Sequence, residues 1–209
     1  MRQRIEGSNP SLSAKQKPKS NTKVFDLGFL LIFRDKCMEW VYETNEDNSA
    51  RFALGQIFDK NGKTLLCFGI NPSTACPTSL DNTIRKLISI SKNNGYDNWI
   101  MLNVYPQRAT NPDDIHQKCD EQLMAQNMQH IRDVVEKYAE SDILLAYGNL
   151  ISKRKFLKTC LNNILSELAR NYNKTIKVIK LTKEGNPVHP LYQSNLAKLC
   201  DFCIKNEND

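Results

Sequence analysis

Residues 63–70, which read KTLLCFGI, form a continuous apolar run with the length of a β-strand. Three further runs of this kind follow along the chain: WIMLNVY at 99–105, DILLAY at 142–147 and TIKVIKL at 175–181. A strand that is covered on both faces is apolar throughout, as in a parallel sheet between two layers of helices. These four stretches therefore predict four buried, parallel strands.

The segments between these runs carry apolar residues at helical spacing. The stripes are Leu80, Ile84, Leu87 and Ile88 in the first segment, Leu123, Met128, Ile131 and Val135 in the second, and Leu157, Leu161, Ile164, Leu165 and Leu168 in the third. Each stripe indicates a helix with one face on the core, and we expect a last helix from about 195 to 204. The alternation predicts an α/β fold, a three-layer α/β/α sandwich around a central, mainly parallel four-stranded sheet.

Additional strands are expected in the N-terminal part of the chain. Apolar runs at 27–33, 37–42 and 51–58 come before Asn61-Gly62, a pair that is typical of tight turns between strands. We therefore expect extra N-terminal strands beside the four-stranded sheet.

Positive charge is concentrated at the start of the chain. The 209 residues have a formal net charge of +6, and residues 1–24 hold six basic groups and one acid, so most of the excess lies there. This segment has too few apolar residues to offset the entropy of ordering it. We expect a disordered basic tail at 1–24 and a single domain at 25–209. Such a tail suits a polyanion such as DNA; a tail that only keeps the protein in solution is the alternative.

Composition also bears on the compartment. No run approaches the roughly 20 apolar residues that cross a bilayer, and the polar N-terminal segment lacks the apolar part of a secretion signal. Seven cysteines without regular spacing argue against a disulfide framework. Only Cys200 and Cys203 form a CxxC pair, whereas an iron–sulfur cluster needs four cysteines. We expect a cytoplasmic monomer that contacts no membrane and carries no cofactor or metal.

Polar loops follow the four predicted strands, at 69–76, 103–110, 147–150 and 182–192. In a parallel sheet the carboxyl ends of the strands meet at one edge, where ligands bind, so these loops should converge on one crevice. Three of them read GINPSTA at 69–75, NVYPQRAT at 103–110 and GNPVHPLY at 185–192. None of these sequences matches a phosphate-binding loop, a dinucleotide fingerprint, a nucleophile elbow or a zinc spacing.

The same motifs carry a resemblance to a known superfamily. GINPS after the first of these strands, an Asn in the second and His-Pro after the last resemble the uracil-DNA glycosylase superfamily, in particular its mismatch-specific branch, whose first motif reads GINPG. The chain is also similar to an uncharacterised bacterial and phage family that shares NPSTA, the RAT of 108–110 and the HPLY of 189–192. The resemblance spans about residues 60–192.

The resemblance implies a uracil-DNA glycosylase-like sandwich and a monofunctional DNA glycosylase. Such an enzyme flips a base out of single- or double-stranded DNA and hydrolyses its bond to deoxyribose, which leaves an abasic site. By the resemblance, the amide of Asn71 positions the attacking water. His189 matches the histidine that donates a hydrogen bond to the departing pyrimidine and stabilises its negative charge. These two residues are the expected catalytic pair.

Other residues would bind the base and the DNA. Asn103 matches the amide that reads the flipped base, and Tyr105 is a candidate to stack on that base. Where uracil-specific relatives have a tyrosine that blocks 5-substituted pyrimidines, this chain has Ser73, so modified or mismatched pyrimidines with a 5-substituent are the expected substrates. The expected DNA contacts come from Lys183, Arg108, Leu191 and Tyr192, the last two as a wedge in the vacated base stack.

Each of the central candidates is also compatible with a purely local role. Asn71-Pro72-Ser73 is a favourable turn, His189 fits an ordinary surface loop, and Asn103 fits backbone satisfaction at a strand end. Two alternative functions stay open as well: a hydrolase of free nucleosides or nucleotides, and a non-catalytic module that binds modified DNA bases. Base-excision repair and defence against phage with modified DNA are the biological settings that fit a glycosylase.

Overall fold

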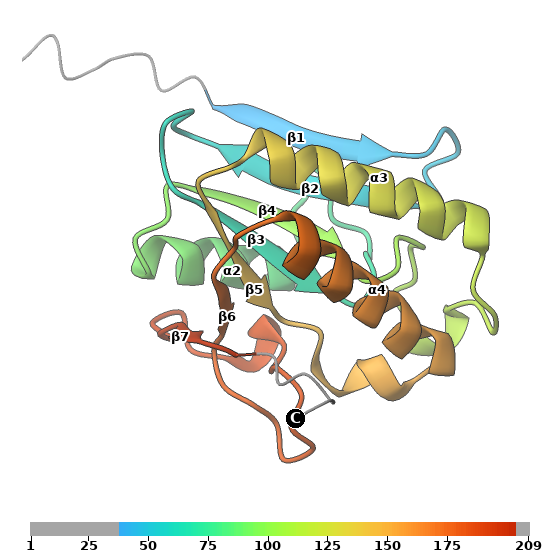
Figure 1. The fold of residues 1–209 in the computed structure, drawn as a ribbon. Coiled ribbons are helices and arrows are strands. Elements are labelled where there is room, and N and C mark those ends of the chain that lie inside the picture. Colours follow the sequence, from blue (N-terminus) through green and yellow to red (C-terminus); the bar gives the residue numbers. More distant parts are fainter. Residues whose placement is uncertain (1–37, 204–209) are drawn as a thin grey trace, which may run out of the picture. The chain divides into compact units, whose positions relative to one another are not determined.

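A seven-stranded mixed sheet forms the centre of the structure, a computed structural model that describes residues 38–203 (Figure 1). The tail predicted at 1–24 and the apolar run at 27–33 lie outside the described residues. In spatial order the strands are β1 (Glu39–Thr44), β2 (Arg51–Ile57), β4 (Asn98–Asn103), β3 (Thr64–Gly69), β5 (Ser141–Leu145), β6 (Ile176–Val178) and β7 (Cys200–Asp201).

The four predicted strands lie next to one another in the middle of this sheet. β4, β3, β5 and β6 pair in parallel, while β1 and β2 add antiparallel strands at one edge and β7 adds one at the other. The α/β class is therefore confirmed, but the sheet among the described residues has seven strands rather than four. The reason is visible in β2, which pairs with β4 in the register Leu54↔Met101 and so satisfies the free backbone groups of that edge.

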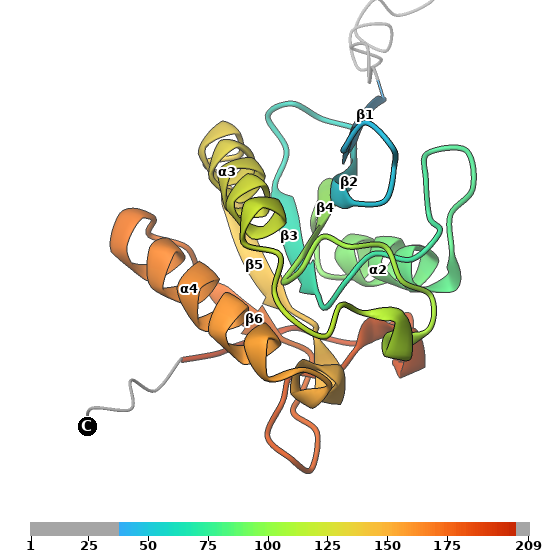
Figure 2. The ribbon, with the colours of Figure 1, turned by 90° about the vertical axis from the view of Figure 1, so that its right-hand side faces the viewer.

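Among residues 38–203, three α-helices cover the two faces of the sheet (Figure 2). α2 (Asn82–Asn93) packs on one face, and α3 (Glu121–Lys137) and α4 (Lys155–Asn171) pack on the other. Each helix uses its predicted stripe: Ile84 and Leu87 of α2 join one apolar cluster, and Ile131 of α3 and Ile164 of α4 join the second. The layers expected from the alternating pattern are thus present in the described residues.

The prediction of a helix at about 195–204 is wrong. The described part of this segment has a turn at 195–196 and then β7, which pairs with β6 through Lys177↔Asp201 and Val178↔Cys200. β6 is itself shorter than the predicted run at 175–181. A short strand at the edge of a sheet needs partners for its outward backbone groups, and this demand outweighs the weak helical spacing of Cys200 and Cys203.

The position of β3 determines where a ligand can bind. β3 lies between β4 and β5 with aligned ends, in the registers Gly69↔Asn103 and Phe68↔Leu145. The chain leaves β3 toward α2 on one face of the sheet, and it leaves β5 toward α4 on the other face. Loops that leave neighbouring strands toward opposite faces open a crevice between them. The expected crevice therefore lies beyond the ends of β3 and β5.

At the amino ends of the parallel strands, the side chain of Asn98 stabilises the turn between β2 and β3. Its side chain is 1% exposed. Oδ1 accepts hydrogen bonds from the backbone N–H groups of Phe58 and Asp59 at 2.8 and 3.0 Å. Nδ2 donates to the carbonyl oxygens of Asp59 and Gly62 at 2.7 and 3.2 Å. One side chain thus satisfies four backbone groups of the turn.

Replacing Asn98 with alanine should destabilise the fold without touching the crevice. The substitution leaves buried backbone donors without partners, which we expect to lower the free energy of unfolding by about 3 kcal/mol. Urea unfolding followed by circular dichroism measures the change. Asn61→Ala, at an exposed position of the same turn, is the matched control and should change stability by less than about 0.5 kcal/mol. Equal stability of the two variants would contradict this account of Asn98.

Candidate functional site

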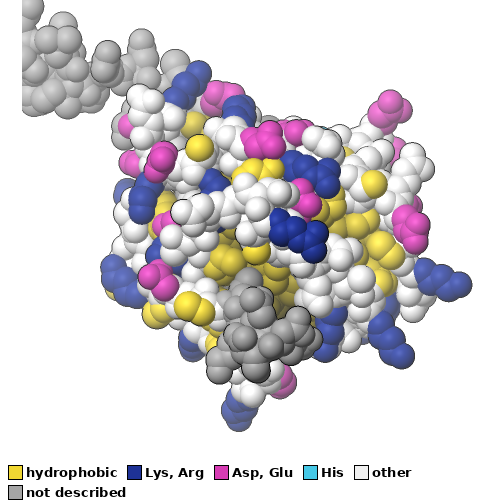
Figure 3. All heavy atoms as spheres, viewed as in Figure 1, with side chains coloured by type: hydrophobic (Ala, Val, Ile, Leu, Met, Phe, Trp, Pro, Cys, Tyr) yellow, Lys and Arg dark blue, Asp and Glu magenta, His cyan; other side chains and the backbone are white. Residues whose placement is uncertain are grey.

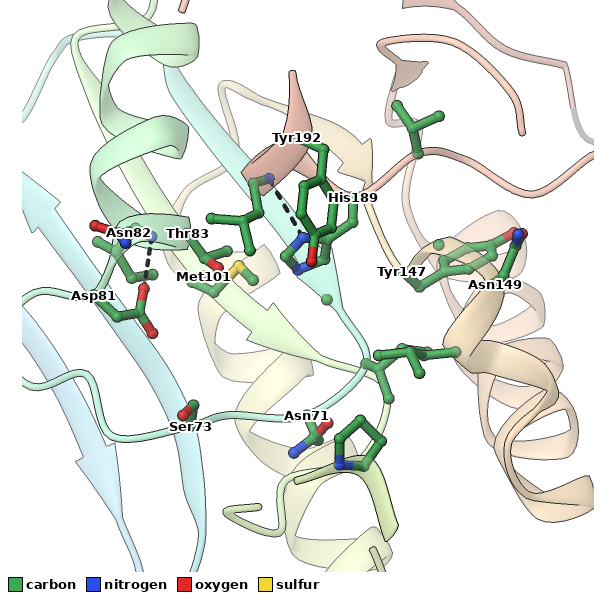
Figure 4. A pocket seen from close by; sticks show the side chains of 18 of the residues that line it. Asn71, Ser73, Asp81, Asn82, Thr83, Met101, Tyr147, Asn149, His189 and Tyr192 are labelled. Carbon is green, nitrogen blue, oxygen red and sulfur yellow. Dashed lines mark hydrogen bonds between the residues drawn. The ribbon is translucent and has the colours of Figure 1, made fainter. Parts of the chain in front are cut away.

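A cavity of about 950 Å³ opens at the carboxyl ends of the parallel strands (Figure 4). Residues from all four loops that the sequence predicted to converge line it. They are 69–71 and 73 at and after the end of β3, 109–110 after β4, 147–150 after β5, and 182, 188–189 and 191–193 after β6. The first residues of α2 complete the wall. The volume lies at the upper end of the range typical of small-molecule sites.

The floor of the cavity is open because β3 ends in glycine. A Cβ atom at Gly69 would lie 2.6 Å from Cε of Met101, which also lines the cavity. Any larger residue would have to displace this methionine and would reduce the space above it. The glycine of the GINPS motif therefore has a steric role in this structure.

Asn71 faces the cavity with a fixed side chain. Its Nδ2 donates hydrogen bonds to the backbone carbonyl oxygens of Ala109 at 2.8 Å and Pro72 at 3.1 Å. Because carbonyl oxygens can only accept, these contacts determine which end of the amide is nitrogen. Oδ1 has no hydrogen-bond partner among residues 38–203 and remains available as an acceptor. The amide can therefore hold a water molecule or a polar ligand group through Oδ1.

His189 lines the same cavity as a neutral donor. The backbone N–H of Leu191 donates to its Nδ1 at 3.3 Å, so in the neutral ring the proton resides on Nε2. Burial lowers the pKa of His189 below its ordinary value, and the carboxylate of Asp81 opposes this effect only in part. The neutral form is therefore favoured near pH 7. Nε2–H is a hydrogen-bond donor with no partner among the described residues.

Backbone contacts hold the His189 loop against the end of β5. Gly148, in the left-handed region at φ +62°, donates its N–H to the carbonyl of Pro187 at 2.8 Å. A Cβ atom at Gly148 would lie 3.4 Å from Cβ of His189, so glycine allows the close approach. Asn149 accepts hydrogen bonds from Thr182 and Asn186 at 2.8 and 3.0 Å, which fixes the far side of the loop.

Three other predicted residues lie at the cavity. Ser73 lines the wall, and its hydroxyl lies 3.1 Å from that of Thr110. Leu191 and Tyr192 belong to the short helical turn Pro190–Tyr192 at the mouth. Tyr192 is 83% exposed, whereas Leu191 is half-buried. Of the two expected wedge residues, Tyr192 is the one that projects into solvent.

Two predicted base-binding residues do not line the cavity. Asn103 is 0% exposed and lies beneath the floor, where its Oδ1 is buried without a partner and would lie 3.5 Å from a Cβ atom at Gly69. Tyr105 lies in the core on the α3–α4 side and packs edge-on against Phe156, with 5.0 Å between the ring centroids. At the end of β4, Asn103 lies below the loop that follows the strand, and Tyr105 lies on the face of the sheet opposite α2. The structure therefore gives neither residue contact with a ligand in the cavity.

Arg108 and Lys183, the predicted basic DNA contacts, differ in their surroundings. Arg108 donates through Nη1 to the carbonyl of Ser73 and through Nη2 to the hydroxyl of Tyr42 at 2.9 Å. It therefore links the loop after β3 to strand β1. Lys183 is exposed in the loop after β6. On the face drawn in Figure 3, basic and acidic side chains intermingle around the outline. The charge of the described residues thus offers no single basic block on that face.

Arg51 is a site residue that the sequence motifs did not reveal. It is the first residue of β2 and lines the cavity, although only 2% of it is exposed. Nη1 donates to the carbonyl of Ala75 at 2.9 Å, whereas Nε is buried without a partner. The available signal was an arginine at the start of the mostly apolar run RFALGQIF.

No metal centre is indicated in the described part of the chain. Residues 38–203 contain no group of three histidine, cysteine, aspartate or glutamate side chains that could hold a metal ion. Cys200 and Cys203 are exposed free thiols. The same residues include no helix with the length and apolar character required to cross a bilayer.

A family model described as "Protein of unknown function (DUF1643)" matches residues 51–191. The chain belongs to this family. The match to the DUF1643 family starts at Arg51 and contains every residue that lines the cavity except Tyr192 and Gln193. Searches of curated proteins and of solved structures found no match.

The lowered pKa of His189 predicts how stability depends on pH. Between the ordinary value of 6.5 and the lower pKa of the folded state, the unfolded chain binds a proton that the folded chain does not. The free energy of unfolding should therefore decrease as the pH falls below 6.5, and this contribution should level off below the folded pKa. Urea unfolding from about pH 5 to 7.5 measures the slope.

His189→Gln should reduce this slope, because glutamine does not titrate. Asn61→Ala, which removes no titratable group, is the control and should leave the slope unchanged. A slope that His189→Gln leaves as steep as in the wild type would show that His189 is not held neutral by its surroundings.

Proposed function

We propose that this chain is a DNA glycosylase that hydrolyses the N-glycosidic bond of a modified or mismatched pyrimidine and leaves an abasic site. The observation that supports this best is the shared cavity of Asn71 and His189, which present an available acceptor and an available donor from the loops after β3 and β6 (Figure 4). The resemblance of GINPS and His-Pro to the uracil-DNA glycosylase superfamily adds to the proposal.

The reaction needs little more than these two groups. Water adds to C1′ of deoxyribose while the bond between C1′ and the base nitrogen breaks, and the bonding electrons leave with the pyrimidine. Negative charge then develops on the carbonyl oxygens of the departing base, and the water loses a proton that protonates the base through solvent. The protein must place the water and stabilise the base anion.

Asn71 fits the first task. Oδ1 accepts a hydrogen bond from the water and orients its oxygen, while Nδ2 stays bound to the carbonyls of Ala109 and Pro72. An amide cannot take up the proton, so catalysis through Asn71 should be slow compared with catalysis by a carboxylate base. His189 fits the second task, because Nε2–H donates to the developing oxyanion without a change in protonation.

The mouth of the cavity fits a base that is flipped out of a helix. The exposed ring of Tyr192 can occupy the space that the base leaves in the stack. Leu150, also at the cavity and exposed, offers a second apolar surface there. These contacts require DNA and would serve no purpose for a free nucleoside.

A hydrolase of free nucleotides is the second candidate. The cavity volume exceeds what a single base needs, and the charged side chain of Arg51 lines it. This enzyme would use Asn71 and His189 in the same roles but would have no use for Tyr192.

Purified protein should release bases from DNA and generate abasic sites. The substrates are oligonucleotides with uracil, thymine mismatches or 5-substituted pyrimidines, and alkaline cleavage scores the product. Asn71→Ala and His189→Ala should each lower the single-turnover rate by about 100-fold or more, as loss of one oriented polar group does in other hydrolases. Asn61→Ala, far from the cavity, should retain the wild-type rate.

Intact DNA from every substrate would contradict the glycosylase proposal. Release of bases from free nucleotides under the same conditions would favour the second candidate. Turnover that survives both substitutions would show that Asn71 and His189 do not carry the reaction.

The small side chain of Ser73 should determine which pyrimidines the cavity can bind. Ser73→Tyr places a ring in the wall of the cavity, where it should exclude substituents at carbon 5 of the base. We expect the rate on a 5-substituted substrate to fall by about tenfold or more relative to the rate on uracil. Ser73→Ala is the control and should preserve the wild-type ratio. An unchanged ratio in Ser73→Tyr would contradict contact between Ser73 and the base.

A further inference from the structure

Arg51 is a buried cation without a carboxylate partner among residues 38–203. The side chain is 2% exposed, and none of the ion pairs in this part of the chain includes it. Its side-chain hydrogen bond goes to the neutral carbonyl oxygen of Ala75. Desolvation by burial, and repulsion from Arg108, lower the pKa of Arg51 to about 10, although attraction to the carboxylate of Asp81 opposes this in part, so Arg51 remains charged at neutral pH.

Part of this guanidinium is available to a ligand. Nη1 is used by Ala75, and Nε is sealed from solvent and has no partner. Nη2 has no hydrogen-bond partner among the described residues and is the donor that a ligand in the cavity can reach. Arg51 nevertheless lines the cavity. A guanidinium with an unused donor at the wall of a cavity is suited to bind an anion through a charge-assisted hydrogen bond.

The start of α2 adds backbone N–H donors at the cavity, beside the carboxylate of Asp81, which also lines it and opposes the binding of an anion. Asn82 and Thr83 line the wall, and the N–H groups at the beginning of a helix have no acceptors within it. Asp81 accepts a hydrogen bond from the N–H of Ile84 at 2.9 Å and so satisfies only one of these donors. Helix beginnings favour negative charge and bind phosphate groups. The buried Arg51 and this helix start face the same space.

We propose that Arg51 and the first residues of α2 form a phosphate subsite of the cavity, which binds a phosphate attached to the nucleoside whose base lies at Asn71 and His189. This inference deepens the proposed function and rests on it for the nucleoside part of the ligand. The phosphate comes either from the DNA backbone or from a free nucleotide. The bond to Ala75 links the subsite to the β3 loop, so a bound phosphate and the position of Asn71 are connected through the backbone of 71–75.

Calorimetric titration of the purified full chain tests the subsite. The probes are deoxyuridine, deoxyuridine 5′-monophosphate and inorganic phosphate at low ionic strength. Wild-type protein should bind the monophosphate at least about tenfold more tightly than the nucleoside, which is the gain expected from one charge-assisted contact. In Arg51→Gln this preference should fall below about twofold. Arg85→Gln, which removes the same charge from the exposed side of α2, should keep the wild-type preference.

A wild-type measurement covers the case in which Arg51→Gln fails to fold. Inorganic phosphate should compete with the monophosphate and leave the affinity for deoxyuridine unchanged. Equal affinities of the wild type for nucleoside and monophosphate would overturn the proposal, and so would a full preference in folded Arg51→Gln. Tighter binding of 5-carboxydeoxyuridine than of the monophosphate would also overturn it, because the anion would then belong to the base.

Two outcomes distinguish the sources of the phosphate. Tighter binding of a short single-stranded oligonucleotide with one uracil than of the free monophosphate supports a backbone phosphate, and the reverse order supports a nucleotide ligand. The readout is binding, so it does not depend on turnover. A phosphate preference without abasic sites would refute the glycosylase and keep the subsite, whereas abasic sites without the preference would do the opposite.

Discussion

The pairing of β3 between two parallel neighbours is the constraint on which the rest of the structure depends. Hydrogen bonds on both sides fix the last residue of β3, Gly69, level with Asn103 of β4 and next to the end of β5. The chain must then leave the sheet at this edge, toward α2 on one face, while the chain after β5 leaves toward α4 on the other. The cavity is the space that this divergence creates, and its position follows from strand order.

Backbone groups, rather than a network of side chains, orient the polar residues of the cavity. Carbonyl oxygens of the β4 loop hold Nδ2 of Asn71, and a single N–H group holds Nδ1 of His189. In each case one end of the side chain is used by the fold and the other end faces the cavity. Such a site is preorganised, because no group must change its partner before a ligand binds.

The sequence predicted the four central strands and three helices because each has a long, consistent apolar pattern. It could not predict β7, whose two residues are exposed and owe their conformation to the free edge of β6. Motif spacing correctly predicted that Asn71 and His189 lie at the cavity, but it placed Tyr105 there as well. Just beyond a strand end, the face of the sheet on which a residue lies depends on how the loop turns, and the motif does not contain this information. Arg51 was not predicted as a site residue, because the loop after β3 that contacts it is remote in sequence.

Arg51 also shows how the fold can store a preference for a ligand. Burying a cation without a carboxylate costs free energy, which the rest of the fold must supply. Replacing Arg51 by an apolar residue would remove this cost. The hydrogen bond to the neutral carbonyl of Ala75 does not by itself offset the cost of burying the charge. An anion that enters the cavity removes the same cost when it binds, so part of the cost of burying the charge becomes affinity for the anion. A buried charge of this kind is therefore better explained by a ligand than by stability.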